Sequence, residues 1–449
     1  MALITSDQFR IIIGVGQTGL SVARYLAGRG LAFAACDTRE SGSAIDRFRD
    51  EFPEIELRTG ALDADWLGRA TELVLSPGVA KSHPAIQSAQ SRGARLLGDI
   101  DLFAREINAP VVAITGSNGK TTVTTLVGQM AADAGVNVAV GGNIGVPVLD
   151  LIDADVELYV LELSSFQLET CSELRPRVAT VLNLSADHMD RYANMLEYHQ
   201  AKHRIYRRAQ VAVYNRDDSL SRPLVAKDVV QMSFGLGAPD LGHYGLLRSD
   251  KGAVLAKGAQ ALLNTDQLKI RGEHNIANAL AALALGEAVR LPLDSMVQTL
   301  SQFAGLPHRC QWVREHRAVS WFNDSKGTNV GATLAAINGL SATQTGEAKL
   351  VLIAGGQSKG QSFAELKQPL VSAARAVILI GEDAQEIGAQ IEHPNTQYAA
   401  NMDEAVRLAA SAAVAGDLVL LSPACASFDM FSGYEARGER FVELVEALA

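Results

Sequence analysis

The chain has 449 residues, of which 48% are hydrophobic and 20% are charged, and its formal net charge is −10. This length predicts about three domains, and this composition excludes a disordered chain. No apolar run reaches the ~20 residues that cross a bilayer, which excludes membrane insertion, and the negative charge disfavours nucleic acid as the main partner.

The cysteines and the first residues bear on the cellular compartment. Cys36, Cys171, Cys310 and Cys425 are far apart and form no Cys-x-x-Cys pair, which is typical of reduced thiols in a cytoplasm. The start, MALITSDQFR, carries Asp7 before any long apolar stretch, which is not typical of a secretory signal. We therefore expect a cytoplasmic protein.

The first predicted elements are a strand at 11–15, a glycine turn and a helix. Gly14, Gly16 and Gly19 form a Gly-x-Gly-x-x-Gly pattern after three isoleucines. Asp37 follows roughly 20 positions later, as in the dinucleotide-binding fingerprint, where phosphate lies at the helix N-terminus. The pattern predicts a nucleotide pocket and leaves a NAD-dependent dehydrogenase open.

Short apolar runs alternate with helix-like amphipathic segments along the whole chain. The predicted strands are residues 11–15, 32–36, 72–75, 111–114, 158–163, 178–184, 211–214, 350–354, 376–380 and 417–421. This alternation predicts an α/β fold with mainly parallel sheets. Residues 220–270 are richer in Gly and Asp and are expected to be irregular or antiparallel.

Two glycine-containing junctions suggest domain boundaries near Gly98 and Gly305. We predict a Rossmann-like domain at 1–98, a central P-loop domain at 99–305 and a Rossmann-like C-terminal domain at 306–449. A dinucleotide domain needs two halves and about six strands, whereas only about four fit before residue 111. A single nucleotide therefore suits the first domain better than NAD.

The second glycine turn, in VVAITGSNGKTTVTTLVGQM (111–130), again joins a strand to a helix. Lys120, between Gly119 and Thr121, would reach the outer phosphates of ATP, and the threonine hydroxyl would ligate Mg²⁺. The full Walker pattern places glycine where this chain has Ile114, so the loop is a shorter Gly-x-x-Gly-Lys-Thr form. The alternative is a glycine turn that merely joins strand to helix.

Several side chains after this loop allow both a functional and a plain interpretation. Glu162, at a strand end, could ligate a metal or cap the next helix, and His188 could be a ligand or polar surface. By periodicity alone, Lys202 is a solvated helix lysine. His199 and His203 have the spacing of a zinc site but no evident third ligand, so we interpret them as two histidines on one helix face.

Seven motifs, in order along the chain, resemble those of the Mur ligases, the ATP-dependent enzymes that add amino acids to the peptidoglycan precursor. They are TGSNGKTT (115–122), GGNIG (141–145), LELSSFQL (161–168), NLSADHMDRY (183–192), GEHNIANALAA (272–282), GLPHR (305–309) and NDSKGTN (323–329). Within the family, CDTRESG (36–42), LSPGVA (75–80) and LLSPACASFDMF (420–431) resemble the branch that adds D-glutamate.

The resemblance implies a bacterial cytoplasmic enzyme, expected to be a monomer, with small-molecule substrates. ATP would phosphorylate the alanine carboxylate of UDP-N-acetylmuramoyl-L-alanine, and the D-glutamate amine would attack the acyl phosphate through a tetrahedral intermediate. Phosphorylation supplies the leaving group, so the protein is left to position the reactants and neutralise charge. Two Mg²⁺ ions are implied, and NAD is not.

The resemblance also implies roles for individual residues. The catalytic residues would be Lys120, Glu162, His188 and Lys202, and the metal ligands Thr121, Glu162, His188 and Lys202 as a carbamate. ATP would contact Gly116, Ser117, Asn118, Gly119, Lys120, Thr121, Thr122, Asn275, Arg309 and Asp324. The UDP-substrate would contact Gly16, Gln17, Thr18, Gly19, Asp37, Thr38, Arg39, Ser76, Pro77, Gly78, Asn143 and His188. D-Glutamate would contact Lys326, Thr328, Lys359, Ser427, Phe428 and Tyr434.

Two departures and one competing function accompany this interpretation. The segment between His188 and Lys202 is one residue shorter than in some relatives, and Tyr434 stands where phenylalanine is expected. Without the resemblance, Asp324 and Lys326 would be a turn with a helix cap. A regulatory NTPase would explain the second glycine loop, but it leaves the third domain and Lys359 without a role. Cys425 is interpreted as a packing residue.

Overall fold

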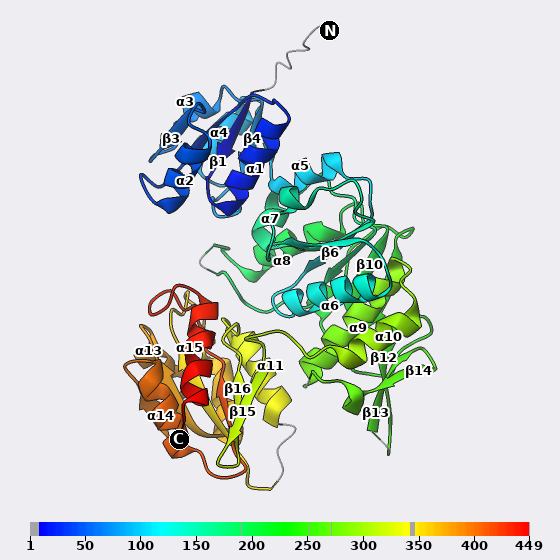
Figure 1. Ribbon diagram of the computed structural model, residues 1–449, viewed down its shortest axis with the longest axis vertical. Coiled ribbons are helices and arrows are strands. Elements are labelled where there is room, and N and C mark those ends of the chain that lie inside the picture. Colours follow the sequence, from blue (N-terminus) through cyan, green and yellow to red (C-terminus); the bar gives the residue numbers. More distant parts are fainter. Residues whose placement is uncertain (1–8, 190, 251, 271, 342–345, 449) are drawn as a thin grey trace.

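The computed structural model describes residues 9–189, 191–250, 252–270, 272–341 and 346–448. The N-terminal stretch with Asp7 lies outside these residues. The chain forms three α/β regions in sequence order, and the N-terminal and C-terminal regions lie on the same side of the central one (Figure 1). The predicted α/β fold with mainly parallel sheets is confirmed.

The first region is a five-stranded parallel sheet in the order β3-β2-β1-β4-β5, one strand more than expected. Its strands are β1 (Arg10–Ile13), β2 (Phe33–Asp37), β3 (Leu57–Thr59), β4 (Glu72–Leu75) and β5 (Arg95–Leu97). Its helices are α1 (Gln17–Gly28), α2 (Ser43–Glu51), α3 (Ala64–Leu67) and α4 (Pro84–Ser91). Buried apolar residues lie on both faces of β1, as parallel sheets require.

The central region has a six-stranded parallel sheet in the order β11-β10-β9-β6-β8-β7. Its strands are β6 (Val111–Thr115), β7 (Val138–Gly142), β8 (Leu158–Glu162), β9 (Val178–Val181), β10 (Val211–Asn215) and β11 (Val230–Phe234). Its helices are α5 (Asp99–Glu106), α6 (Lys120–Asp133), α7 (Ser165–Thr170), α8 (Met195–His203), α9 (Glu273–Ala288) and α10 (Leu293–Gln302).

Residues 220–270 are only partly as expected. An antiparallel sheet of β12 (Tyr244–Ser249), β13 (Gly252–Lys257) and β14 (Gln260–Asn264) confirms the antiparallel part. The expectation is wrong for β11, which pairs in parallel with β10. This strand lies at the edge of its sheet and exposes Val230 and Gln231, so its sequence carries no continuous apolar run.

The third region has a six-stranded sheet in the order β15-β16-β20-β17-β18-β19, parallel except for the β15–β16 pair. Its strands are β15 (Gln311–His316), β16 (Val319–Asn323), β17 (Leu350–Gly355), β18 (Ala374–Ile380), β19 (Thr396–Tyr398) and β20 (Leu418–Leu421). Its helices are α11 (Val330–Ser341), α12 (Lys367–Ala373), α13 (Ala384–Ile391), α14 (Met402–Ala412) and α15 (Tyr434–Glu446). Short 3-10 helices are η1 (Val148–Leu151), η2 (Arg204–Tyr206), η3 (Ser219–Ser221), η4 (Thr265–Gln267) and η5 (Ala364–Leu366).

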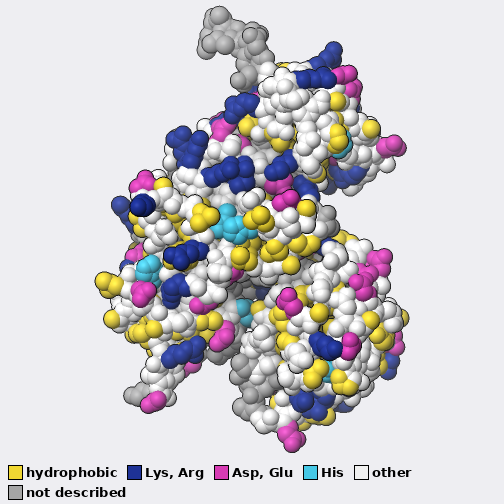
Figure 2. All heavy atoms as spheres, turned by 180° about the vertical axis from the view of Figure 1, so that it is seen from behind, with side chains coloured by type: hydrophobic (Ala, Val, Ile, Leu, Met, Phe, Trp, Pro, Cys, Tyr) yellow, Lys and Arg dark blue, Asp and Glu magenta, His cyan; other side chains and the backbone are white. Residues whose placement is uncertain are grey.

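The first and central regions share one apolar core, which fixes their contact. Ile12, Phe103 and Tyr159 belong to the same buried cluster, and α5 lies between the two sheets. On the face opposite Figure 1, Lys and Arg side chains gather where these regions meet (Figure 2). Between the two regions, Arg105 of α5 forms ion pairs with Glu72 at 3.0 Å and with Glu173 at 2.9 Å. No helix in the described ranges is long and apolar enough to cross a membrane.

Candidate active site between the three sheets

The second glycine loop joins β6 to α6 at the carboxyl edge of the central sheet. Gly119 has a φ of 80°, and a Cβ there would lie 2.4 Å from the Asn278 side-chain oxygen. Asn183, after the neighbouring strand β9, accepts the Asn118 backbone N–H at 2.8 Å. The loop is therefore held in the form that presents backbone N–H groups at a helix N-terminus, which is suited to phosphate.

Lys120 folds back over this loop. Its Nζ donates to the carbonyl oxygens of Gly116 at 2.9 Å and Ser117 at 2.8 Å. Burial lowers the pKa of Lys120, while Glu162 and Asp187 act in the opposite direction. A half-buried ammonium that bonds only to neutral carbonyls is a strong attractor for an incoming anion.

A chain of hydrogen bonds within the central region leads from this loop to the cavity at the first glycine turn. Thr121 donates from Oγ1 to Glu162 Oε2 at 2.8 Å, and Asn143 donates from Nδ2 to Glu162 Oε1 at 3.0 Å. Asn143 also lines the cavity of the first glycine turn. From the third region, Lys326 Nζ donates to Thr121 Oγ1 at 3.1 Å. The Glu162 carboxylate thus joins the glycine loop to the wall of that cavity, and the third region reaches the same place through Thr121.

The oxygen donors at this point suit Mg²⁺. Magnesium in nucleotide sites takes one or two protein oxygens and completes its shell with water and phosphate oxygens. Thr121 Oγ1 and Glu162 Oε2 lie within hydrogen-bond distance and can supply such a pair. Within the described ranges no group of three His, Cys, Asp or Glu side chains could enclose a metal. The donor set therefore fits a metal that arrives with nucleotide.

Lys202 is buried and not solvated, which excludes its plain interpretation. Only 2% of the residue is exposed, and its Nζ donates to the Gly116 carbonyl at 2.9 Å. Its ammonium lies 4.8 Å from the centre of the Tyr198 ring. Burial, followed by the charge of Lys120, lowers the pKa of Lys202 well below its ordinary value. A neutral amine, the form that reacts with electrophiles, is therefore favoured.

His188 lies in the loop after β9, with a φ of 58°. Its ring packs edge-on against Phe166 at 4.9 Å, and Nε2 is 3.8 Å from the Asp187 carboxylate. Burial lowers the pKa of His188, and the charge of Lys359, from the third region, lowers it further, although Asp187 raises it. A neutral imidazole can offer a ring nitrogen to a ligand.

A cavity of about 330 Å³ between the central and third regions gathers many of the predicted ATP contacts. Its predicted lining residues are Asn118, Gly119, Thr122, Asn275, Arg309 and Asp324, together with Lys326. Gly116, Ser117, Lys120 and Thr121 do not line it. His274 and Asn278 line it too and were missed, although Asn278 lies one helical turn after Asn275.

Arg309 and Asp324 form the charged part of this cavity. The Arg309 Nε is buried and has no hydrogen-bond partner in the described part of the chain, and burial lowers its pKa. Burial raises the pKa of Asp324 to about 6, although Ser422 donates to its carboxylate at 2.7 Å. An unsatisfied buried guanidinium calls for an anion, and phosphate matches its forked geometry.

A second cavity, of about 540 Å³, lies at the first glycine turn. Its predicted lining residues are Gly16, Gln17, Thr18, Asp37, Thr38, Arg39, Ser76, Pro77, Gly78 and Asn143. Gly19 and His188 do not line it. The Asp37 carboxylate already accepts hydrogen bonds from Val15 N–H and from the Arg39 guanidinium, at 2.9 and 2.7 Å. A uracil contact at Asp37 would have to share or replace these bonds.

The predicted amino-acid contacts are less fully assembled. The Lys326 ammonium lies 4.8 Å from the centre of the Tyr434 ring, and the hydroxyl of Tyr434 is paired with Glu435. Ser427 is buried whereas Phe428 is 69% exposed. No described cavity collects Thr328, Lys359 and these two residues.

Arg437 supports the amino-acid region and was missed by sequence reasoning. It is buried and donates to the carbonyls of Ser325 at 2.8 Å and Cys425 at 3.1 Å. Cys425 itself is fully buried, as expected of a packing residue, and burial raises the pKa of its thiol to about 12.

The two helix histidines form no metal site among the residues that the structure describes. The rings of His199 and His203 stack at 3.9 Å, and His203 Nε2 lies 2.7 Å from the Leu220 carbonyl oxygen.

Comparison with known proteins identifies similar chains over the full length. Residues 8–98 match the family described as Mur ligase MurD-like, N-terminal domain; 114–286 match the Mur ligase middle domain; and 308–425 match the Mur ligase glutamate ligase domain. The UDP-N-acetylmuramoylalanine–D-glutamate ligase of Pseudomonas aeruginosa is 56% identical, with all of both chains covered. The enzyme of the same name from Acinetobacter baylyi is 51% identical over 99% of this chain and 100% of its own.

Solved structures share the fold at low identity. The MurF ligase from Thermotoga maritima in complex with ADP has a TM-score of 0.62 and 17% identity, over 99% of this chain and 96% of that one. A pseudomurein peptide ligase type C from Methanothermus fervidus also has a TM-score of 0.62, with 18% identity over 98% of this chain and 99% of that one.

Proposed function

The chain belongs to the Mur ligase family, and we propose on that basis that it joins D-glutamate to UDP-N-acetylmuramoyl-L-alanine in peptidoglycan precursor synthesis. It is an ATP-dependent ligase that forms a C–N bond and releases ADP and phosphate. One observation carries this proposal. The hydrogen bonds Thr121–Glu162–Asn143 connect a phosphate-type glycine loop directly to the cavity of the first glycine turn.

The reaction needs a carboxylate and a terminal phosphate to meet. The alanine carboxylate attacks the γ-phosphorus, ADP leaves, and an acyl phosphate forms. The D-glutamate amine then attacks the acyl carbon, and the tetrahedral intermediate expels phosphate as the amide forms. Holding the reactants together contributes more than any covalent role of the protein, because positioning alone can lower the barrier by ~7–11 kcal/mol.

We assign the chain's own residues to these tasks by position. Lys120 and Arg309 neutralise the phosphates, because both are half-buried cations with no carboxylate bonded to them in the described chain. Thr121, Glu162 and His188 would hold Mg²⁺, with a carbamylated Lys202 to orient the site. Magnesium, when bound, withdraws electron density from the γ-phosphate and screens the approaching carboxylate.

The carbamate of Lys202 is the boldest of these assignments. A lysine takes up carbon dioxide only as a neutral amine, and burial next to Lys120 favours that form. The carbamate would return a negative charge to a place that now holds two buried lysines, which balances the local charge.

The remaining assignments follow the same logic. The cavity at the first glycine turn holds the UDP handle, the cavity between the central and third regions holds ATP, and D-glutamate is held by Lys326, Thr328, Lys359, Ser427, Phe428 and Tyr434. Domain boundaries near Gly98 and Gly305, a monomeric state and a cytoplasmic location belong to the same proposal. Three separate sheets, spanning 10–97, 111–234 and 311–421, support the boundaries.

The function is tested by omitting one substrate at a time. Purified protein is incubated with ATP, Mg²⁺, UDP-N-acetylmuramoyl-L-alanine and D-glutamate, and ADP is measured. We expect steady ADP release only with the complete mixture. Equal release without either the nucleotide-sugar or the amino acid would refute the ligase assignment.

A further inference from the structure

Arg191 connects the wall of the cavity at the first glycine turn to the loop that carries His188. It lies three residues after that histidine, in the central region. Its guanidinium donates from Nη2 to the Val79 carbonyl at 3.1 Å and from Nη1 to the Pro77 carbonyl at 3.5 Å. Both carbonyls belong to the 76–79 loop of the first region, which lines the cavity assigned to the UDP handle.

The same guanidinium also contacts Phe166, the aromatic ring that packs against His188. Its central carbon lies 4.6 Å from the centre of the Phe166 ring, a cation–π distance. Phe166 in turn packs edge-on against His188 at 4.9 Å. One side chain therefore touches the cavity wall and the aromatic support of His188 at the same time.

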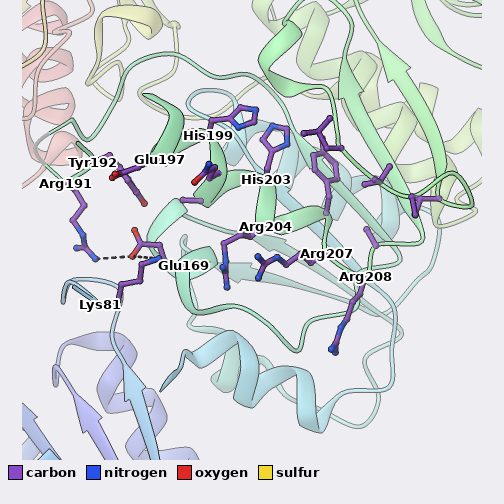
Figure 3. A pocket seen from close by; sticks show the side chains of 18 of the residues that line it. Lys81, Glu169, Arg191, Tyr192, Glu197, His199, His203, Arg204, Arg207 and Arg208 are labelled. Carbon is purple, nitrogen blue, oxygen red and sulfur yellow. Dashed lines mark ion pairs between the residues drawn. The ribbon is translucent and has the colours of Figure 1, made fainter. Parts of the chain in front are cut away.

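A carboxylate from α7 completes the contact. Glu169 lies 3.8 Å from Arg191 and 4.0 Å from Lys81, which follows the 76–79 loop in the first region. Figure 3 shows another cavity, separate from the two described above. The side chains of Arg191, Glu169 and Lys81 converge at one end of it, where dashed lines mark both ion pairs. The Glu169 side chain is only 7% exposed, so solvent screens these pairs less than surface pairs.

We propose that Arg191 is a positioning residue that sets the 76–79 loop, and with it the UDP-substrate, at a fixed distance from His188. The inference rests on the proposed function. A substrate held at one end by its nucleotide must present its carboxylate at the other end. A shift of ~1 Å at the reacting atoms can cost about a hundredfold in rate. Arg191 touches neither end, and it acts by holding the two protein surfaces together.

The test compares three variants of the full chain: Arg191→Ala, Arg191→Lys and the control Arg207→Ala. Arg207 is exposed and has no ion pair within the described ranges. KM and kcat are measured for each of the three substrates, alongside the melting temperature. Binding of UDP-N-acetylmuramoyl-L-alanine without ATP is measured by calorimetry.

We expect Arg191→Ala to lower kcat/KM for the UDP-substrate by about tenfold or more, the effect of losing one charged hydrogen bond. Its calorimetric Kd should rise in parallel, while the KM values for ATP and D-glutamate stay at the control's values. Arg191→Lys should recover part of the loss, because an ammonium can reach the Val79 carbonyl but cannot also lie flat on the Phe166 ring.

The outcomes separate this inference from its premise. If all three KM values rise equally and the melting temperature falls, Arg191 only stabilises the fold, and the inference fails. Unchanged kinetics in Arg191→Ala would also overturn it. If Arg191→Ala does not fold, Arg191→Lys decides the matter by the same criteria. A wild-type protein that makes no ADP would instead refute the proposed function.

Discussion

Three basic side chains of the central and third regions lie buried or half-buried around the second glycine loop, with no carboxylate bonded to them in the described chain. Lys120 and Lys202 both donate to the Gly116 carbonyl, and Arg309 leaves its Nε without a partner in the described chain. Isolated buried charge costs several kcal/mol unless it is paired. Their arrangement around one glycine loop is therefore an arrangement for binding anions.

Replacing Lys120 tests the phosphate role directly. In Lys120→Ala the charge that faces the transferring phosphoryl group is lost, so kcat should fall by about a hundredfold or more. The fold should persist, since the side chain bonds only to carbonyls of its own loop. Turnover is measured by ADP release and the fold by circular dichroism; a correctly folded variant with near-normal turnover would contradict the ATP-site assignment.

Replacing Lys202 tests the carbamate. Lys202→Ala should be inactive and should regain part of its activity in millimolar acetate, because the small carboxylate can occupy the space of the carbamate. The control is Lys227→Ala, at an exposed position, which should need no rescue. No rescue, together with an unmodified lysine in native mass spectra of the wild type, would disprove the carbamate.

Sequence reasoning reached residues with local motifs and missed those defined only by packing. Lys120 and Thr121 stand within a glycine motif that announces its chemistry. Lys202 has no such signal, because its helix presents polar residues all round and only the fold shows that this lysine is buried. Arg437 was missed for the same reason.

At the scale of elements, the first glycine turn separates two uses of glycine. A Cβ at Gly19 would lie 1.9 Å from the Gly14 carbonyl oxygen, whereas a Cβ at Gly16 would meet no atom within 4 Å. Gly19 lets the helix and the strand approach each other, and Gly16 leaves space where the cavity lies. Substitutions at Gly16 and Gly19 therefore form a matched pair for experiment.

Gly16→Ala should keep the wild-type melting temperature but weaken UDP-N-acetylmuramoyl-L-alanine binding, because the new methyl group occupies ligand space. Gly19→Ala should lower the melting temperature, because the new methyl group collides with backbone. Scanning fluorimetry and calorimetry measure the two effects. If Gly16→Ala binds the nucleotide-sugar as tightly as the wild type, this turn does not hold the ligand.

The helix that links the first two regions carries a buried acid with a pH signature. Burial raises the pKa of Asp99 from 3.8 to about 6, although Gln167 donates to it at 3.2 Å; nearby Asp101 raises it further. A raised carboxyl pKa means that stability is lost as the pH rises through about 6. A rise of about two units corresponds to about 3 kcal/mol at most.

Asp99→Asn should therefore raise the melting temperature at pH 7.5, where the wild-type carboxylate is charged. The gain should shrink at pH 5, where the wild type is largely protonated. Thermal unfolding at both values measures this difference. A gain that is equal at both pH values would show that ionisation of Asp99 is not the cause.

Element prediction succeeded where strands are buried on both faces. All the apolar runs taken as strands are strands, with ends that shift by at most three residues. Among the missed strands, β3, β5 and β19 have three residues each, and β15 lies at a sheet edge and exposes Trp312. The inner strand β16 was also missed, because its residues alternate between buried and half-buried. Edge strands bury one face at most, so their sequences lack a continuous apolar signal.

For the whole molecule, the proposed function gives each of the two glycine loops a nucleotide of its own. The first lies in a five-stranded region too small for two mononucleotide halves, and the second lies where the third region reaches the central one. Asn329 donates to Asn118 at 3.2 Å, and Lys326 donates to Thr121 at 3.1 Å, so the third region covers the ATP loop directly. Such contacts exclude water from the transferring phosphate.

The sequence could not predict this arrangement of the regions. Contacts such as Asn118–Asn329 join residues 211 positions apart, and no local pattern encodes them.

The most direct measurement is a panel of amino acids with product identification. The protein is incubated with ATP, Mg²⁺ and UDP-N-acetylmuramoyl-L-alanine plus one amino acid at a time, including D-glutamate, L-glutamate, D-aspartate and meso-diaminopimelate. We predict ADP release with D-glutamate alone, and a nucleotide product whose mass has increased by one glutamate minus water. Release of ADP without such a product, or a product with another amino acid in preference to D-glutamate, would contradict the account.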